Sequence, residues 1–132
     1  MAVCESDVLI ESLKAIVGLA GYREGEDIES KNYQDAMGAR SIPPVLLLRP
    51  DSTEQVSEIL KACHGAGQPI APQGGMTGLV SAAAPLEGEI SLSFERMKKV
   101  VEVDPFTSSM TVEAGAELQT IQEKADAHGL LF

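Results

Sequence analysis

The sequence predicts an α+β fold, in which a small parallel βαβ unit is followed by short antiparallel strands and a helix. A fully apolar run, a helical pattern and a second apolar run occur between 45 and 72, as a parallel unit requires. Short β-type runs then follow one another closely between 89 and 115, which is typical of hairpins. With 132 residues, 44% of them hydrophobic, the chain can form one core but not two.

The segment at 7–20 has the spacing of an amphipathic helix, and Gly21 stands just past its predicted end. Its apolar face would carry Leu9, Leu13, Ile16 and Ala20. Residues 22–44 are polar and weakly periodic and end with two prolines, so we interpret them as a long surface connection. We therefore divide the chain into 1–44, a helix with a connecting segment, and 45–132, the main unit.

The parallel unit starts with VLLLRP at 45–50, which is apolar on both faces as a buried strand requires. Two overlapping capping boxes follow, Asp51 with Glu54 or Ser52 with Gln55, and either one would start a helix.

That helix would end at Gly65 and Gly67, and the run PIAP at 69–72 would be the second strand, reached by a right-handed crossover. Its inner face would carry Val56, Ile59, Leu60 and Cys63.

After a glycine-rich loop, three short runs predict antiparallel strands: EISLSF, KVVEVD and SMTVEAG. The intervening FERMKK at 94–99 is predicted to be a solvated turn. Residues 116–128 predict a helix that Gly129 terminates, and the chain finishes on an apolar, strand-like run. The inner face of this helix would carry Leu118, Ile121 and Ala125.

The net charge of −10, from 20 acidic and 10 basic residues, argues against nucleic acid as a partner because phosphate binding needs a basic face. The N-terminal stretch has no basic leader, and charged residues interrupt its apolar run, so we expect neither a signal peptide nor a membrane span. Cys4 and Cys63 make no disulfide framework, and neither has a metal-ligand spacing. His64 and His128 lie in no triad pattern. We expect a reduced, cytoplasmic protein without a metal.

The stretch QPIAPQGGMTGLVSAAAP at 68–85 gathers glycines and small side chains between prolines. It is not a Walker A loop, because no lysine follows a glycine at the required spacing. GAGQPI at 65–70 is not a dinucleotide fingerprint, because Ile70 replaces the third glycine and Pro69 would break the helix.

We interpret the loop as an anion-binding nest. Gly74 and Gly75 permit positive φ angles and remove every Cβ from one side, so that successive N–H groups can converge on an anion. The Thr77 hydroxyl adds a donor, Gly78 lets the chain leave without a clash, and a diphosphate suits such a site. On the residues alone, the alternative is a strained connection that needs glycines only for its path.

Four stretches, in this order, resemble the N-terminal part of the FAD-binding (PCMH-type) domain of the vanillyl-alcohol oxidase superfamily. They are VLLLRPDSTEQVSEIL, PIAPQGGMTGLVSAAAP, GEISLSFERMKKVVEVDP and MTVEAGAELQTIQEKADAHGLLF. Within that superfamily, PQGGMTGLV followed by LSFERMKKVVEVD is most similar to the FAD-linked D-2-hydroxyacid dehydrogenases, of the D-2-hydroxyglutarate and D-lactate types. The resemblance covers 45–132, with a looser similarity in 33–44.

The resemblance implies two subdomains with FAD between them, and a glycine loop whose N–H groups bind the FAD diphosphate. Some relatives attach FAD covalently through a histidine in this loop; Met76 stands here instead, which implies non-covalent FAD. Ser81 stands where relatives often have glycine, and it is small enough to preserve the path. The implied FAD-binding residues are Pro72, Gln73, Gly74, Gly75, Met76, Thr77, Gly78, Leu79 and Ala82.

The implied activity is oxidation of a D-2-hydroxyacid to a 2-oxoacid, with an electron acceptor that the sequence leaves open. The alternatives are a FAD-dependent oxidase of another alcohol or sugar, and a non-catalytic, self-associating binding module; a homo-oligomer is compatible with all three. Relatives carry their catalytic base and substrate domain beyond the matching region. We therefore expect no catalytic residue within 1–132 and interpret the chain as part of a longer enzyme, cut through a β-element at Phe132.

Overall fold

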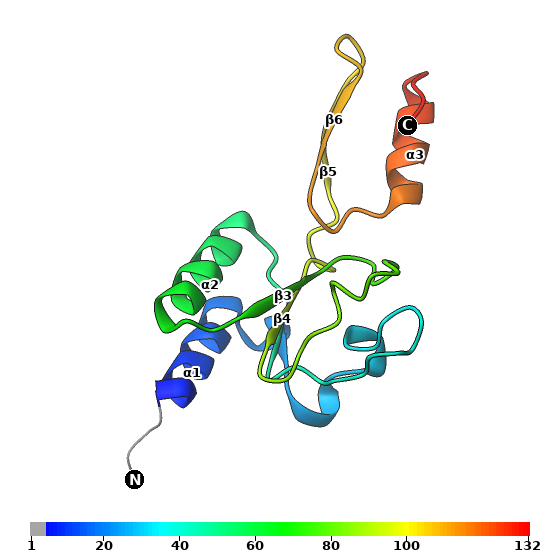
Figure 1. Cartoon of the computed structure of the whole chain (residues 1–132). Coiled ribbons are helices and arrows are strands. Elements are labelled where there is room, and N and C mark those ends of the chain that lie inside the picture. The colour runs from blue at the N-terminus through cyan, green and yellow to red at the C-terminus, as the bar shows by residue number, and fades with distance from the viewer. Residues whose placement is uncertain (1–4) are drawn as a thin grey trace.

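The computed structural model describes residues 5–132, which form a body and a projecting arm (Figure 1). The body contains a four-stranded sheet in the order β1-β2-β4-β3. The arm contains the two-stranded sheet β5-β6, with the helix α3 beside it. The predicted α+β class is confirmed.

The elements of the body are α1 (Glu5–Val17), β1 (Tyr22–Arg23), β2 (Leu47–Leu48), α2 (Thr53–Ala66), β3 (Ile70–Gln73) and β4 (Ile90–Ser93). Three short 3-10 helices lie between α1 and β2, at Leu19–Gly21, Gly25–Asp27 and Ser30–Asn32. The elements of the arm are β5 (Val100–Asp104), β6 (Ser109–Val112) and α3 (Leu118–Ala127).

The core lies where α1 and α2 pack together against the sheet (Figure 1). In the body, two residues predicted to face inward do not, as Leu118 of the arm does not: Ala20 is exposed because α1 already ends at Val17, and Leu60 is 47% exposed beside the buried Ile59. The core cluster consists of Leu13, Val17, Leu46, Leu48, Ile59, Cys63, Ile90 and Leu92. Burial raises the pKa of the Cys63 thiol, as expected for a small core residue. Cys4 lies outside the described residues.

Local chemistry sets the ends of α2. Ser52 is the N-cap, and its hydroxyl accepts a hydrogen bond from the Gln55 N–H at 3.3 Å, so the second of the two predicted capping boxes is used. The Gln55 side chain reaches back to the N–H of Asp51 at 3.0 Å. The helix ends at Gly67 in the left-handed conformation, while Gly65 lies inside the helix.

The expectation that 89–94 begins the antiparallel strands is wrong. β4 is a central strand of the body sheet and runs parallel to both β2 and β3, so that it lies between the two strands of the predicted βαβ unit. The alternation of serines with apolar residues suggested one exposed face. However, all four residues of β4 are buried, and Ser91 accepts a hydrogen bond inside the core. The remaining pair, β5 and β6, is the predicted antiparallel hairpin.

Residues 22–44 do more than connect. β1 pairs antiparallel with β2 at the edge of the sheet, and Ile28, Asn32 and Asp35 are buried. The interpretation of the whole segment as a surface connection is therefore wrong at these positions.

The turn at 94–99 is also more ordered than a solvated turn. Met97 is buried, Glu95 pairs with Arg49, and the Arg96 guanidinium pairs with Asp51 at 2.9 Å. These contacts attach the base of the arm to the segment that follows β2.

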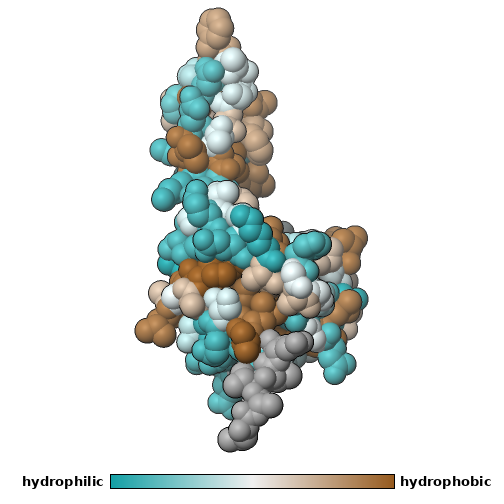
Figure 2. All heavy atoms as spheres, turned by 90° about the vertical axis from the view of Figure 1, so that its left-hand side faces the viewer, coloured by the Kyte–Doolittle hydropathy of each residue, from teal (hydrophilic) through white to brown (hydrophobic). Residues whose placement is uncertain are grey.

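In the arm, Ala125 of α3 is buried as predicted, Ile121 is half-buried, and Leu118 is 57% exposed. The final residues form no strand. Apolar side chains lie exposed along the arm, and Figure 2 shows such surface on the arm and on the body. Those of the arm are Val101, Phe106, Leu118, Leu131 and Phe132. Between residues 5 and 132, no helix is long and apolar enough to cross a membrane.

Candidate cofactor-binding site

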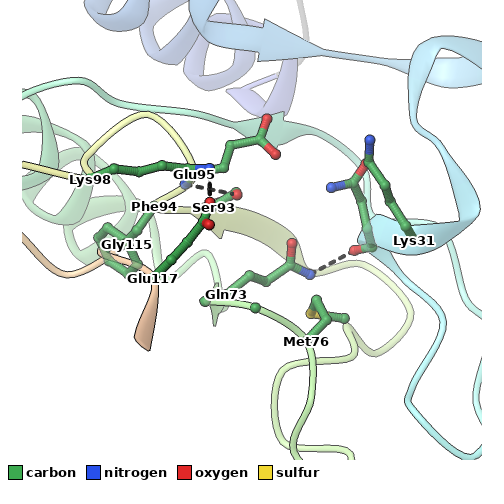
Figure 3. Close-up of a pocket in the computed structure, with 12 residues that line it drawn as sticks. Lys31, Gln73, Met76, Ser93, Phe94, Glu95, Lys98, Gly115 and Glu117 are labelled. Atoms are coloured by element: carbon green, nitrogen blue, oxygen red, sulfur yellow. Dashed lines mark hydrogen bonds and ion pairs between the residues drawn. The ribbon is translucent and has the colours of Figure 1, made fainter. Parts of the chain in front are cut away.

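A cavity of about 240 Å³ lies where β3 and β4 end, at Gln73 and Ser93 (Figure 3). The carboxyl ends of parallel strands are the usual place for ligands in such sheets. The cavity is bordered by the body on one side and by the base of the arm on the other. Its lining consists of Lys31, Asn32, Gln73, Gly74, Gly75, Met76, Ser93, Phe94, Glu95, Lys98, Gly115 and Glu117.

The glycines of the loop do not have the backbone angles that we expected. The positive φ angle occurs at Met76, at 57°, and not at Gly74, Gly75 or Gly78. The prediction that the glycines supply positive φ is therefore wrong.

Packing does not require these glycines either. A Cβ built on Gly74 or Gly78 would have no neighbouring heavy atom within 4 Å, and one on Gly75 would touch only the Thr77 methyl at 3.9 Å. Neither the backbone angles nor the packing of the described chain thus explains why glycine occupies positions 74, 75 and 78.

The amides at the tip of this loop have no hydrogen-bond partner among residues 5–132. Across the part of the chain that the structure describes, no backbone N–H from Gly74 to Gly78 donates a hydrogen bond to a protein acceptor. The loop is largely exposed, with Met76 half-buried. A run of consecutive free N–H groups is the feature that an anion-binding nest requires.

Gln73 anchors the start of the loop from inside. Its side chain is 1% exposed, and its Nε2 donates to the carbonyls of Asn32 at 2.7 Å and Ala83 at 3.0 Å, and to the Ser91 hydroxyl at 3.0 Å. Two of these acceptors are carbonyl oxygens, so the amide nitrogen must face them. The Oε1 atom is buried and has no hydrogen-bond partner among the described residues.

Two lysines bring positive charge to the cavity. Lys31 pairs with Glu29 at 2.9 Å, and Lys98 pairs with Glu117 at 2.6 Å. The hydrogen bond to Glu117 raises the pKa of Lys98, and the same contact lowers the pKa of Glu117. Lys98 is therefore charged at neutral pH, and the carboxylates of Glu29 and Glu117 offset part of the positive charge at the cavity.

The end of the loop is held at Ser81, which has a φ of 56°. Its hydroxyl donates to Asp35 at 2.6 Å, and the same carboxylate accepts from the N–H groups of Ala39 and Arg40 at 2.8 and 3.1 Å. These hydrogen bonds, the one from Ser81 first, hold the pKa of Asp35 below its ordinary value.

Of the residues predicted to bind FAD, four line the cavity: Gln73, Gly74, Gly75 and Met76. Pro72, Thr77, Gly78, Leu79 and Ala82 are exposed on the same loop or its approach and lie outside the lining.

Sequence reasoning missed Lys31 and Asp35, which come from the segment interpreted as a connection. It also missed the contribution of the arm base, where Lys98, Gly115 and Glu117 reach the same cavity. The only local signal for Asp35 was its position three residues before Gly38, which is typical of a turn.

Comparison with known proteins identifies the family. Residues 44–132 match the family model described as FAD binding domain. A relative from Oryza sativa subsp. indica, named probable D-2-hydroxyglutarate dehydrogenase, mitochondrial, is 34% identical over 93% of this chain and 22% of its own length. A Danio rerio relative, named probable D-lactate dehydrogenase, mitochondrial, is 29% identical over 94% of this chain and 25% of its own length. The chain thus spans about a quarter of the length of these relatives.

Solved structures share the fold. An alkyldihydroxyacetonephosphate synthase aligns with a TM-score of 0.79 at 21% identity, over 92% of this chain and 27% of its own. A p-cresol methylhydroxylase aligns with a TM-score of 0.73 at 20% identity, over 98% of this chain and 26% of its own. The resemblance inferred from the four sequence stretches is confirmed. This chain belongs to the FAD binding domain family, and FAD is its cofactor.

Proposed function

We propose that residues 73–79 bind the diphosphate of FAD through backbone N–H groups, within an oxidoreductase that oxidises a D-2-hydroxyacid to a 2-oxoacid. The observation that supports this proposal is the loop Gly74–Gly78 beside the cavity at the ends of β3 and β4. Its N–H groups have no hydrogen-bond partner among the described residues, and its glycines carry no side chain. When bound, FAD supplies the redox chemistry by accepting a hydride, and the share of this chain is to bind and orient it.

The residues present fit a diphosphate. It offers several anionic acceptors to the free N–H groups, and it can approach the backbone closely because no Cβ projects from Gly74 or Gly78. Lys31 adds a positive charge at the border of the cavity. Gln73 fixes the start of the loop, while Thr77 adds a hydroxyl. Leu79 is the last residue of the binding segment, and Pro72 and Ala82 flank it.

The cavity holds only part of FAD. Its volume of about 240 Å³ is below the roughly 300–1,000 Å³ of sites that enclose a drug-sized ligand. We therefore expect the 132-residue chain to bind FAD weakly, with the remaining contacts supplied from elsewhere.

We further propose that FAD is held without a covalent bond. Met76 stands in the loop, and its thioether cannot form the link that a histidine can. The lining residues include no histidine, cysteine or tyrosine. Acid precipitation of the FAD-loaded protein should leave all flavin in the supernatant, and flavin in the pellet would contradict the proposal.

The substrate class rests on the named relatives, which are dehydrogenases of D-2-hydroxyglutarate and D-lactate. The alternatives are a FAD-dependent oxidase of another alcohol or sugar, and a self-associating binding module. The names of these relatives place them in mitochondria, so the cytoplasmic location expected from the sequence stays a prediction. The oligomeric state and the electron acceptor also stay open to experiment.

The test of FAD binding is an equilibrium titration followed by flavin fluorescence, comparing the unmodified chain with Gly74→Ala. The added methyl would stand where a phosphate oxygen approaches, so we expect the Kd to rise about tenfold, equivalent to about 1.4 kcal/mol. Gly65→Ala is the matched control, because its Cβ also meets nothing and it lies in α2. Equal affinity for FAD in all three proteins would refute the proposed role of the loop.

The substrate class needs a separate assay on the natural polypeptide that carries this sequence. Reduction of an artificial dye should be faster with D-2-hydroxyglutarate or D-lactate than with the L enantiomers. Turnover of sugars or other alcohols alone would favour the second alternative, and a flavin-free protein that sediments as an oligomer would favour the third.

A further inference from the structure

The end of the glycine loop is fixed by a residue far away in the sequence. The Ser81 hydroxyl donates to the carboxylate of Asp35 at 2.6 Å, across 46 residues of chain. Ser81 has a φ of 56°, a conformation that side chains other than glycine rarely adopt. The hydrogen bond to Asp35 is placed to stabilise Ser81 in this conformation.

Asp35 is itself held firmly. It is 7% exposed, and besides Ser81 it accepts hydrogen bonds from the N–H groups of Ala39 and Arg40. Arg40 completes the contact, because its guanidinium donates to the Ser81 carbonyl at 3.3 Å. Ser81 is thus hydrogen-bonded through both its hydroxyl and its carbonyl.

The same segment also holds the start of the loop. Gln73 donates to the carbonyl of Asn32 at 2.7 Å. Figure 3 marks this hydrogen bond as the dashed line from the Gln73 side chain. Both ends of 73–81 are therefore fixed by residues 32–40, which precede the 44–132 region matched by the family model. The free N–H groups of Gly74–Gly78 lie between these two anchors.

We propose that Asp35 is a positioning residue for FAD binding, which holds Ser81 in the left-handed conformation and so preorganises the amides of 74–78. This inference rests on the proposed role of the loop. A loop ordered before binding loses less conformational entropy when the ligand arrives, so its affinity is higher. The functional unit accordingly begins near residue 32 and not at residue 44.

The arm offers a matched control. Asp104 makes the same kind of contacts, accepting from the Thr107 hydroxyl at 2.7 Å and the Phe106 N–H at 2.9 Å. Ser108 in that turn has a φ of 53°. Asp104 bonds to Phe106 and Thr107 and not to Ser108 itself, and the turn lies in the β5-β6 hairpin and contributes nothing to the lining of the cavity at the strand ends.

The first measurement needs no FAD. Backbone ¹⁵N order parameters would be compared for the unmodified chain, Asp35→Ala, Ser81→Ala and Asp104→Ala. We expect values for 74–80 to fall from about 0.8 to below about 0.6 in the Asp35 and Ser81 variants, and to stay unchanged in Asp104→Ala. Ser81→Ala removes only the hydroxyl and keeps the Asp35 turn, so it decides the matter if Asp35→Ala does not fold.

The second measurement is the FAD titration. Asp35→Ala and Ser81→Ala should raise the Kd about tenfold through lost preorganisation, while Asp104→Ala should not change it. Adding Ser81→Gly to Asp35→Ala should restore part of the affinity, because glycine adopts this φ without a bonded hydroxyl. Unchanged order parameters in both loop variants would overturn the inference. If the unmodified chain binds no FAD, the proposed function fails, and the order parameters alone decide whether Asp35 orders the loop.

Discussion

Two glycine-containing segments meet at the cavity, and they need bare backbone for opposite reasons. A Cβ on Gly115, at the base of the arm, would lie 1.9 Å from the carbonyl oxygen of Phe94 and 2.9 Å from that of Met97. A Cβ on Gly74, in the loop, would meet nothing within 4 Å. The packing of the protein itself requires Gly115, whereas nothing in the described chain requires a glycine at position 74.

This difference distinguishes a glycine that the fold requires from a glycine that is expected to serve ligand binding. A glycine against its own backbone reports how two segments pack, so its replacement should damage stability first. A glycine facing open space, with free N–H groups beside it, reports where a ligand approaches, so its replacement should damage binding first. The same Gly-to-Ala change is therefore expected to have different effects at the two positions.

The largest effect is expected for Gly115→Ala. The methyl cannot fit beside the Phe94 carbonyl, so the backbone of 94–97 or of 113–115 must move, and the Gly115 N–H bond to the Met97 carbonyl at 2.8 Å is strained. We expect a loss of about 3 kcal/mol in the free energy of unfolding, measured with denaturant. Gly74→Ala should lose nothing and can gain up to about 1 kcal/mol, because alanine restricts the unfolded chain. Equal stability of the two variants would contradict the comparison.

A smaller effect is expected at Met76, the residue that takes the positive φ between these glycines. Met76→Gly removes the strain of a left-handed non-glycine residue but adds flexibility to the unfolded chain, so we expect a net gain of about 0.5 kcal/mol. Ser108→Gly, at a φ of 53° in the exposed hairpin turn, should give the same gain and calibrates it, because Ser108 does not line the cavity at the strand ends. A loss of stability in Met76→Gly alone would show that the Met76 side chain packs usefully beside the cavity.

The sequence predicted what depends on neighbouring residues. The cap at Ser52 was one of the two that the sequence predicted, and the stop at Gly67 was predicted together with Gly65, which lies inside the helix. The β5-β6 hairpin also follows from local chemistry and was predicted. The position of β4 was not predicted correctly. Serines that are buried and hydrogen-bonded inside the core give the same alternation of polar and apolar residues as a strand with one exposed face.

In the site, too, features of one short segment were predicted, whereas contacts between distant segments were not. The glycine loop stands out in the sequence, but the reason first given for its glycines, positive φ, was wrong, because the turn is made at Met76. The contact between Asp35 and Ser81 spans 46 residues and leaves no periodic pattern, so no local rule predicts it. The lysines at the cavity have the same origin, since they come from segments brought together only by the fold.

The smallest predicted effect concerns pH and compares two aspartates that lie beside a serine at positive φ, Asp35, which bonds to Ser81, and Asp104, which bonds to the turn before Ser108. Hydrogen bonds to the carboxylate lower the pKa of Asp35, and bonds from Thr107 first and then from the turn amides lower that of Asp104. Because the pKa is lower in the folded state, each group stabilises the fold fully above the ordinary aspartate value of about 4. That contribution is lost as the pH falls through the lowered folded-state pKa.

Melting temperatures between pH 7 and pH 2 measure this directly. The difference between the unmodified chain and Asp35→Ala should be largest above about pH 5 and should shrink steadily in acid, and the same should hold for Asp104→Ala. Only the loss at Asp35 should be accompanied by weaker FAD binding, because only that carboxylate holds the glycine loop. If the difference at Asp35 persisted down to pH 2, the neutral acid would be holding Ser81 as well as the carboxylate does. Position 35 would then act through the shape of its turn, and the charge of its side chain would be irrelevant to the loop.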